Sequence, residues 1–248
     1  MNLEKRKSYR RNSKKNPWRN TRNDKEIPWR EIWAAVFMII LPIMVVTLAT
    51  NFVFRSEAFY SFHFAKTEVV KEIPFSITQE DLSKTFADYM QHKSSTFQLV
   101  EKTEYMPQKL FNDRDGNIMA TIRMILDVGL VFSMIFLIGA LSIFAFLIRK
   151  GEKQLIYGRF LDSLTFFGAL LLVNLAINLI VPVRELIFRM LFGVRFPPGD
   201  VLIQIFQTKF SLYLAGWELV ASVVIMGVIG YFVHLLASRR KMFRKVEE

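Results

Sequence analysis

The sequence predicts a mainly α-helical, polytopic membrane protein with four transmembrane helices. Hydrophobic residues make up 52% of the 248 positions, Phe occurs 24 times, and the mean hydropathy is +0.26. A soluble domain of this size usually carries less apolar side chain. Four stretches reach the roughly 20 apolar residues that a helix needs to cross a hydrocarbon core of about 30 Å. They are residues 32–53, 124–148, 161–183 and 211–237.

The first span contains Pro42. We expect this proline to bend the helix rather than end it, because neighbouring helices can satisfy the freed carbonyl. A basic segment precedes the span and "TLA" at 47–49 loosely resembles a cleavage site, so a cleaved signal peptide is the alternative. The apolar run is longer than the roughly 7 to 15 residues of a signal core, which favours a retained helix.

Residues 54–123 are too polar to span a membrane and predict a small extracytoplasmic domain. Within it, "FSITQEDLSKTFADYMQHK" predicts an amphipathic helix. Thr78 can cap its start, with Asp81 three residues later. The apolar residues that recur at helical spacing are Leu82, Phe86, Tyr89 and Met90. The next segment, "FQLVEKTEYMPQKLFNDRDGN", predicts short extended pieces and a turn at Asp115–Gly116.

Residues 184–210, between the third and fourth spans, predict a helix lying in the outer membrane interface. Leu186, Ile187, Met190, Leu191 and Val194 can share one face, and charged residues fall elsewhere. Pro197-Pro198-Gly199 would end this helix. An ordinary connecting helix packed on the extracytoplasmic domain is the alternative.

The distribution of positive charge predicts that both termini are cytoplasmic. Lys and Arg accumulate in cytoplasmic segments next to membrane spans. The basic tails 1–31 and 238–248 and the loop 149–160 hold 20 of the 33 Lys and Arg residues. This surplus also explains the net charge of +11 as attraction to anionic inner-leaflet lipids. A nucleic-acid partner is disfavoured because the tails contain no base-reading motif.

Metal and thiol chemistry are not expected from this composition. The chain has no Cys, which excludes disulfides, thiolate metal sites and a catalytic thiol. Its three histidines, His63, His92 and His234, lack the spacing of a metal motif. We therefore expect no cofactor.

Polar residues near the outer ends of three spans predict a ligand pocket. Asp127 lies about one turn into the second span and Glu218 about two turns into the fourth. Asn174 and Asn178 share a face of the third span. Intramembrane acids usually face the helix bundle, so these four side chains could form a polar pocket, with Arg123 and Arg184 at its rim. Alternatively they only hold helices together, with Asp127 pairing to Arg123 at i, i+4.

The chain resembles the lipoprotein intramolecular transacylases, a family of bacterial integral membrane proteins. The resemblance covers about residues 32–237 and rests on the order of spans, a "QEDL…YM" helix, a "DV" at the second span, and an "F-x-x-x-F…DVLIQIF" element. It implies a plasma-membrane protein that handles a lipoprotein or phospholipid acyl chain at the outer leaflet.

The family's two histidines are absent here. The resemblance aligns Arg123 or Met124 with the first of them and Arg189 with the second. Neither Arg nor Met can act as a base near neutral pH. Arg189 remains a candidate for lipid contact.

Three functions stay open at this point. The first is binding of a lipid or lipopeptide without histidine-based acyl transfer. The second is a noncatalytic scaffold or partner subunit of another membrane protein. The third is an active acyltransferase acting on lipoprotein or phospholipid, with Asp127 or Glu218 as the base.

Overall fold

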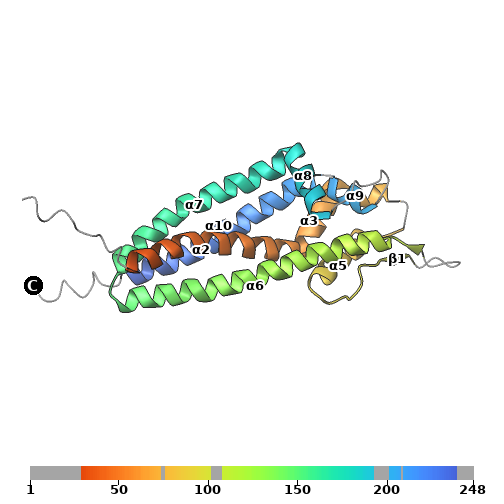
Figure 1. Ribbon diagram of the computed structural model, residues 1–248. Helices are drawn as coiled ribbons and strands as arrows, with labels where there is room; N and C mark the ends of the chain where they lie inside the picture. Colours follow the sequence, from red (N-terminus) through yellow and green to blue (C-terminus); the bar gives the residue numbers. More distant parts are fainter. Residues whose placement is uncertain (1–28, 74–75, 102–107, 193–200, 208, 239–248) are drawn as a thin grey trace, which may run out of the picture.

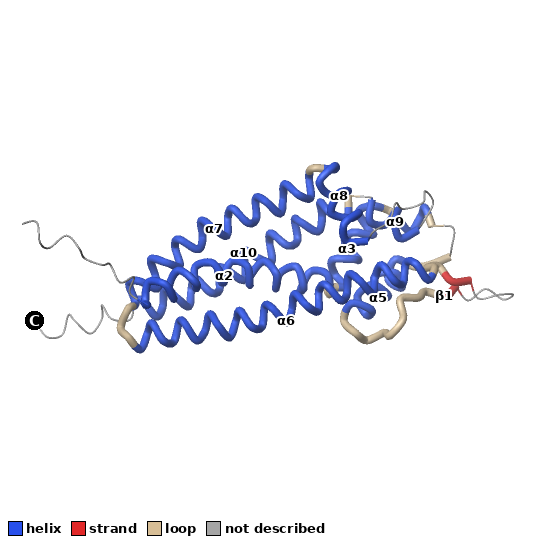
Figure 2. The backbone as a smooth tube through the Cα atoms, viewed as in Figure 1, coloured by secondary structure: helices blue, strands red, loops and turns tan. Residues whose placement is uncertain are grey.

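The computed structural model describes residues 29–73, 76–101, 108–192, 201–207 and 209–238. Four long helices form an elongated bundle (Figures 1 and 2). They are α2 (Trp29–Phe54), α6 (Asp113–Arg149), α7 (Lys153–Leu179) and α10 (Phe210–Ser238). All four are long and apolar enough to cross a membrane, which confirms the predicted fold class of a multi-pass, mainly helical membrane protein.

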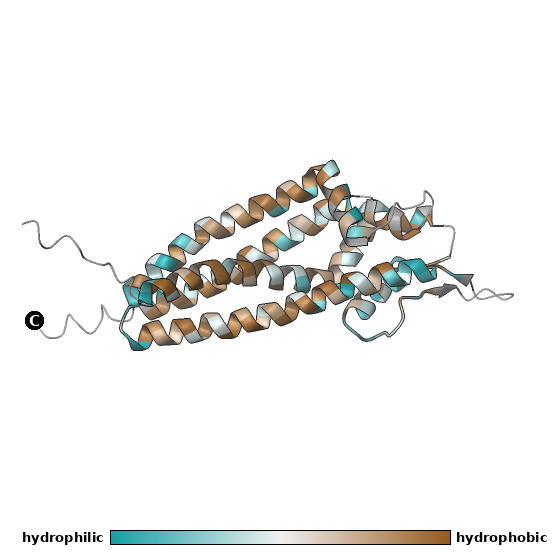
Figure 3. Cartoon of the chain, viewed as in Figure 1, coloured by the Kyte–Doolittle hydropathy of each residue, from teal (hydrophilic) through white to brown (hydrophobic). Residues whose placement is uncertain are grey.

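The long helices pack around α2, which contacts α6, α7 and α10. Hydrophobic residues make up most of the length of the bundle, and hydrophilic residues are concentrated at its two ends (Figure 3). Pro42 lies inside α2 and does not end it, as predicted. At one end, which we call the tail end, Arg30 pairs with Glu152, and the Lys153 ammonium donates to the Leu236 carbonyl. Helix α2 begins and helix α10 ends at this end of the bundle (Figure 1).

The opposite end carries a small folded unit, here called the head. It comprises the described residues between α2 and α6, the first turns of α6, and α9 (Val201–Gln207). Between α2 and α6 the chain forms α3 (Glu57–Thr67), α4 (Val69–Glu72) and α5 (Gln79–Met90). Strands β1 (Val100–Glu101) and β2 (Gln108–Lys109) then pair antiparallel.

Helix α5 matches its prediction in both its start and its buried face. The Thr78 hydroxyl accepts a hydrogen bond from the Asp81 amide at 3.1 Å, which satisfies one of the free donors of the first turn. Leu82, Phe86, Tyr89 and Met90 are all buried.

Aromatic side chains form the core of the head. Phe86 of α5 lies 5.1 Å from Tyr60 and 5.5 Å from Phe64 of α3, measured between ring centroids. Leu202 and Ile205 of α9 are fully buried in the same core. The seven residues of α9 are too few to show a helical period, so the sequence did not predict this helix.

The turn predicted at Asp115–Gly116 is wrong, because α6 already begins at Asp113. The Asn112 side chain accepts from the Asp115 amide at 2.9 Å, and the Asp115 carboxylate accepts from the Asn112 amide at 3.0 Å. This reciprocal capping box favours a helix over a turn. The first turns of α6 therefore belong to the head, where Ile118 and Met119 are buried in its core.

The segment after α7 begins a new helix, α8 (Val181–Phe192), three residues before the predicted start of the interfacial helix. Leu186 and Met190 of the predicted apolar face are exposed, at 52% and 74%. The side chains of Ile187 and Leu191, together with Val194 and Pro197-Pro198-Gly199, lie outside the described part of the chain.

Candidate functional site

Arg55, Asp127 and His92 form a charged cluster where the bundle meets the head. The Arg55 guanidinium, just beyond the end of α2, donates to the Asp127 carboxylate of α6 at 2.6 Å. His92 Nε2 lies 3.0 Å from the same carboxylate oxygen. One acid near the membrane is thus held by two basic side chains from other elements, which offsets the cost of placing it there.

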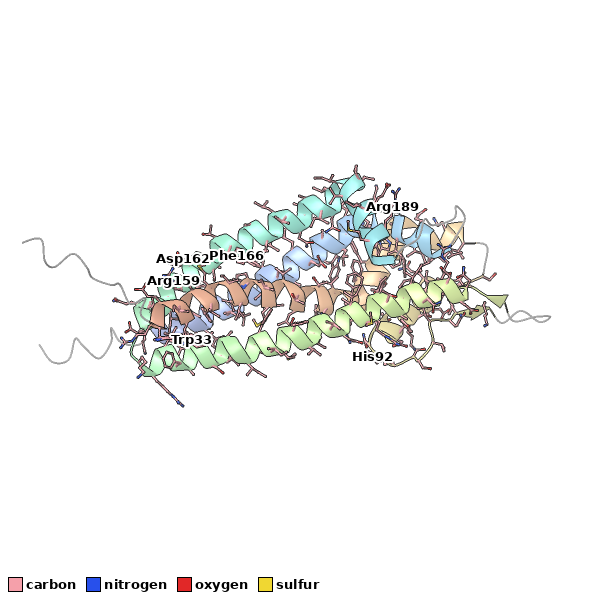
Figure 4. The ribbon with its side chains drawn as sticks, in the orientation of Figure 1. Trp33, His92, Arg159, Asp162, Phe166 and Arg189 are labelled. Atoms are coloured by element: carbon pink, nitrogen blue, oxygen red, sulfur yellow. The ribbon has the colours of Figure 1, made fainter. Side chains whose placement is uncertain are left out.

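The backbone after α5 presents His92 to Asp127. Met90 is the last residue of α5, and His92 follows in the left-handed conformation with φ 63°. The Lys93 amide donates back to the Asp88 carbonyl at 2.8 Å, closing the helix end. Glycine usually occupies the left-handed position of such a motif. The histidine ring is half exposed and lies on the lower side of the molecule in Figure 4.

Arg123 does not form the i, i+4 pair with Asp127. Its guanidinium carbon lies 4.1 Å from the centre of the Tyr89 ring, and Nη1 donates to the carbonyls of Tyr89 and Ser94. These carbonyls lie at and just beyond the end of α5, where a cation is stabilised by the helix dipole. Arg123 therefore attaches α6 to the head and leaves Asp127 to Arg55 and His92.

Glu218, Asn174 and Asn178 form a second, separate group between α7 and α10. Asn174 Nδ2 donates to the Glu218 carboxylate at 2.7 Å, and Asn178 Nδ2 donates to the Asn174 side chain and carbonyl. Glu218 is only 4% exposed, and Thr50 of α2 lies beside it. Among the described residues, no hydrogen bond joins this group to Asp127.

Asp127 and the Glu218 group thus have different hydrogen-bond partners, and α2 contacts α6 as well as α7 and α10. The Glu218 group has the geometry of hydrogen bonds that hold helices together. Arg189 is exposed on α8, on the opposite side of the molecule from His92 (Figure 4). Arg184 lies in α8, but its side chain is outside the described part of the structure.

A cleft of about 550 Å³ opens beside the Arg55 cluster. Its polar lining comes from Asn51, Arg55, Ser56, Glu57 and Gln91, and its apolar lining from Leu48, Phe52 and Leu130. We call it the junction cleft, because it lies between the last turns of α2, the facing part of α6 and the end of α5. Phe52 is 65% exposed, so the apolar side of this cleft is open to the surroundings.

Two buried polar atoms of the cleft residues lack partners among the described residues. They are the Nε donor of Arg55 and the Oδ1 acceptor of Asn51. Buried donors and acceptors are nearly always satisfied, and leaving one unpaired costs about 1 to 3 kcal/mol. An unpaired donor and an unpaired acceptor thus belong to two residues that line the cleft.

Sequence reasoning identified Asp127 and missed its partners. Arg55 is an ordinary basic residue after a membrane span, and His92 follows an amphipathic helix without any motif around it. The helix predicted over "FSITQEDLSKTFADYMQHK" included His92, so the sequence carried no signal that this histidine lies beyond the end of α5.

The fold and the cleft define a multi-pass membrane protein with a cleft of polar and apolar residues at the junction of its helices and its head. Comparisons with protein-family models, with curated proteins and with solved structures gave no match to this chain.

Proposed function

We propose that this protein binds the polar headgroup of a membrane lipid or lipopeptide in the junction cleft. The observation that carries the proposal is the lining of the cleft, which combines Arg55 and other polar residues with apolar side chains at the end of α2, a helix long and apolar enough to cross a membrane. A lipid has the same division, with a polar headgroup attached to hydrocarbon. Small-molecule sites combine an apolar wall with a few polar groups in the same way.

Arg55 would supply the main contact with the headgroup. Asp127 fixes one edge of its guanidinium, and the Nε–H is left without a protein partner. Guanidinium groups bind phosphate and carbonyl oxygens strongly when their geometry is fixed in advance. Asn51 Oδ1 could accept from an amide or ammonium group of the same ligand.

We further propose that the head faces the outside of a bacterial plasma membrane. The excess of Lys and Arg in the two tails and the 149–160 loop supports cytoplasmic termini. The resemblance to the lipoprotein intramolecular transacylases supports the membrane and the outer leaflet. In this arrangement the junction cleft would take an outer-leaflet lipid or the lipid-modified end of a lipoprotein.

Lipidomic mass spectrometry of the gently purified protein tests this proposal. We expect a defined lipid or lipopeptide to copurify with the unmodified chain and to be lost from Arg55→Gln. The matched control is Arg159→Gln, because Arg159 also pairs with an acid, Asp162, but on α7 (Figure 4). Equal lipid content in all three proteins would overturn the proposal and favour a scaffold that binds other proteins.

A second function, acyl transfer, is favoured by the distance of 3.0 Å between His92 and Asp127. If Nε2–H donates to the carboxylate, Nδ1 is left to accept a proton, as a general base does. An amine nitrogen would then attack an ester carbonyl carbon. Its proton would pass to His92 and on to the departing alkoxide as the ester C–O bond breaks.

The N-termini of lipoproteins from a bacterial host without a transacylase would decide between binding and transfer. Binding alone leaves these N-termini with both ester-linked chains. Production of the lyso form with an acylated amine, and its loss in His92→Gln, would establish acyl transfer.

A further inference from the structure

We propose that the lipid bound in the junction cleft extends one acyl chain along the seam between α2 and α6 into an apolar cavity in the tail half of the bundle. This inference rests on the proposed function and adds a site for the hydrocarbon part of the ligand.

The cavity has a volume of about 220 Å³ and lies between α2, α6 and α10. Every side chain that lines it is apolar. Leu141 and Phe232 form part of its wall and are each 58% exposed, so the cavity opens at the surface of the membrane-spanning region. A cavity without polar groups does not retain water, and an apolar ligand fits it best.

On α2, one stripe of residues joins the cavity to the junction cleft. Phe37, Leu41 and Met44 line the cavity, and Leu48 and Phe52 line the cleft. Each residue of this series follows the previous one by three or four positions, which places all five on one side of the helix.

The facing helix, α6, carries a similar stripe. Leu130 lines the cleft, while Leu137, Leu141 and Phe144 line the cavity. Their spacings of seven, four and three residues keep them on one face. Asp127 lies three residues before Leu130 and marks the polar end of the stripe. Each helix thus carries apolar residues on one face that begin near the charged cluster and end at the cavity.

The distance along this track suits an acyl chain. Met44 lies eleven residues before Arg55, which corresponds to about 16 Å along a helix that rises about 1.5 Å per residue. One half of the hydrocarbon core of a bilayer is also about 15 Å thick. A chain whose headgroup lies at Arg55 therefore reaches the cavity with its last methylenes.

Photoactivatable phosphatidylglycerol tests the inference with the full chain in nanodiscs. One probe carries a diazirine on the headgroup, and the other carries it at the end of an acyl chain. After irradiation, peptide mapping should place the headgroup label near Phe52 and Gln91 and the chain-end label near Leu141 and Phe232. In Arg55→Gln both labels should decrease together.

Ala140→Phe provides the sharper comparison, because Ala140 lines the cavity and is 5% exposed. Its ring would occupy the space of at least two methylenes, so chain-end labelling of the cavity should fall by about tenfold or more. Headgroup labelling should stay within about twofold of the unmodified chain, because lipid is in excess. Ile138→Phe, at a position 66% exposed on the same helix, should change neither label. Leu137→Trp repeats the test if Ala140→Phe does not fold.

The failures of the two proposals can be told apart. No headgroup label in the cleft would overturn the proposed function and this inference with it. A headgroup label in the cleft with chain-end label spread over outward-facing residues such as Ile135 and Ile138 would overturn the inference alone. Cavity labelling that persists in Arg55→Gln would also overturn it, because the cavity would then be filled by an unrelated lipid.

Discussion

At the scale of single residues, the burial of His63 makes the stability of the head depend on pH. It is fully buried on α3, its Nε2 lies 3.3 Å from the Ile205 carbonyl of α9, and its Nδ1 has no partner among the described residues. Burial lowers the pKa of His63, and the hydrogen bond from its Nε2 to the Ile205 carbonyl opposes this only in part. The folded head therefore holds a neutral imidazole where the unfolded chain, with a pKa of about 6.5, binds a proton more readily.

We expect the stability of the head to be highest above about pH 6.5 and to fall as the pH decreases below that value. The unfolded state then binds more protons, and one such group changes stability by at most about 1.4 kcal/mol per pH unit. Thermal unfolding in detergent can be followed through intrinsic tryptophan fluorescence, to which Trp217, in contact with Phe59 and Phe62, contributes.

The matched variants are His63→Phe and His234→Gln. His63→Phe removes the proton site while keeping an aromatic ring in the core. The thermal stability of this variant should therefore decrease less below pH 6.5 than that of the unmodified chain. His234 is exposed on α10, so His234→Gln should leave the decrease in place. A decrease of the same size in His63→Phe would show that another group causes it.

The candidate site could be predicted only in part from the pattern of residues in the sequence. Asp127 could be recognised from the sequence, because an acid inside an apolar run is costly and needs partners. Its partners come from positions 72 and 35 residues away, and no local spacing connects them. The nearer basic residue, Arg123, was the natural choice on a helix, but the Tyr89 ring and the end of α5 hold it elsewhere.

At the scale of elements, close contact between α2 and α6 depends on Gly129. A Cβ atom at this position would lie 3.2 Å from Thr47 Cγ2 and 3.4 Å from Asn51 Nδ2. Gly139, ten residues further along α6, has nothing within 4 Å of the same position. The two glycines thus offer the same substitution in a tight and in an open environment.

We expect Gly129→Val to lower the thermal stability of the protein in detergent, and Gly139→Val to change it little. The added methyl groups at position 129 must push α2 away from α6, and overpacking of this kind typically costs about 1 to 3 kcal/mol. The difference between the two unfolding midpoints measures the effect. Equal midpoints would mean that the helices adjust without strain.

The helices themselves were predictable to different degrees. Length and hydropathy were sufficient for the four spans, because the bilayer thickness sets a minimum length that few soluble segments reach. The start of α6 was not predictable in the same way, since "DRDGN" contains the residues of a turn and becomes helical through the Asn112–Asp115 capping box. Helix α9 owes its burial to contacts with the distant α3 and α5 core.

At the scale of the whole molecule, the two ends of the bundle should lie on opposite sides of the membrane, with the head outside. The chain has no Cys, so single cysteines can be introduced at exposed positions on the two ends. Ser95→Cys lies in the head and Gln154→Cys at the tail end. We expect an impermeant thiol reagent added to intact cells to label Ser95→Cys and to label Gln154→Cys only after permeabilisation. The reverse pattern would show that the head faces the cytoplasm.

The central claim is that the junction cleft holds a lipid by its headgroup. A crystal structure of the full chain grown in a lipidic mesophase would test it most directly. We predict lipid density in the cleft, with its polar end within hydrogen-bond distance of Arg55 Nε or Asn51 Oδ1 and a chain directed along Leu48 and Leu130. Ordered cleft side chains with no lipid density, or with Arg55 Nε and Asn51 Oδ1 satisfied by the protein itself, would contradict the claim.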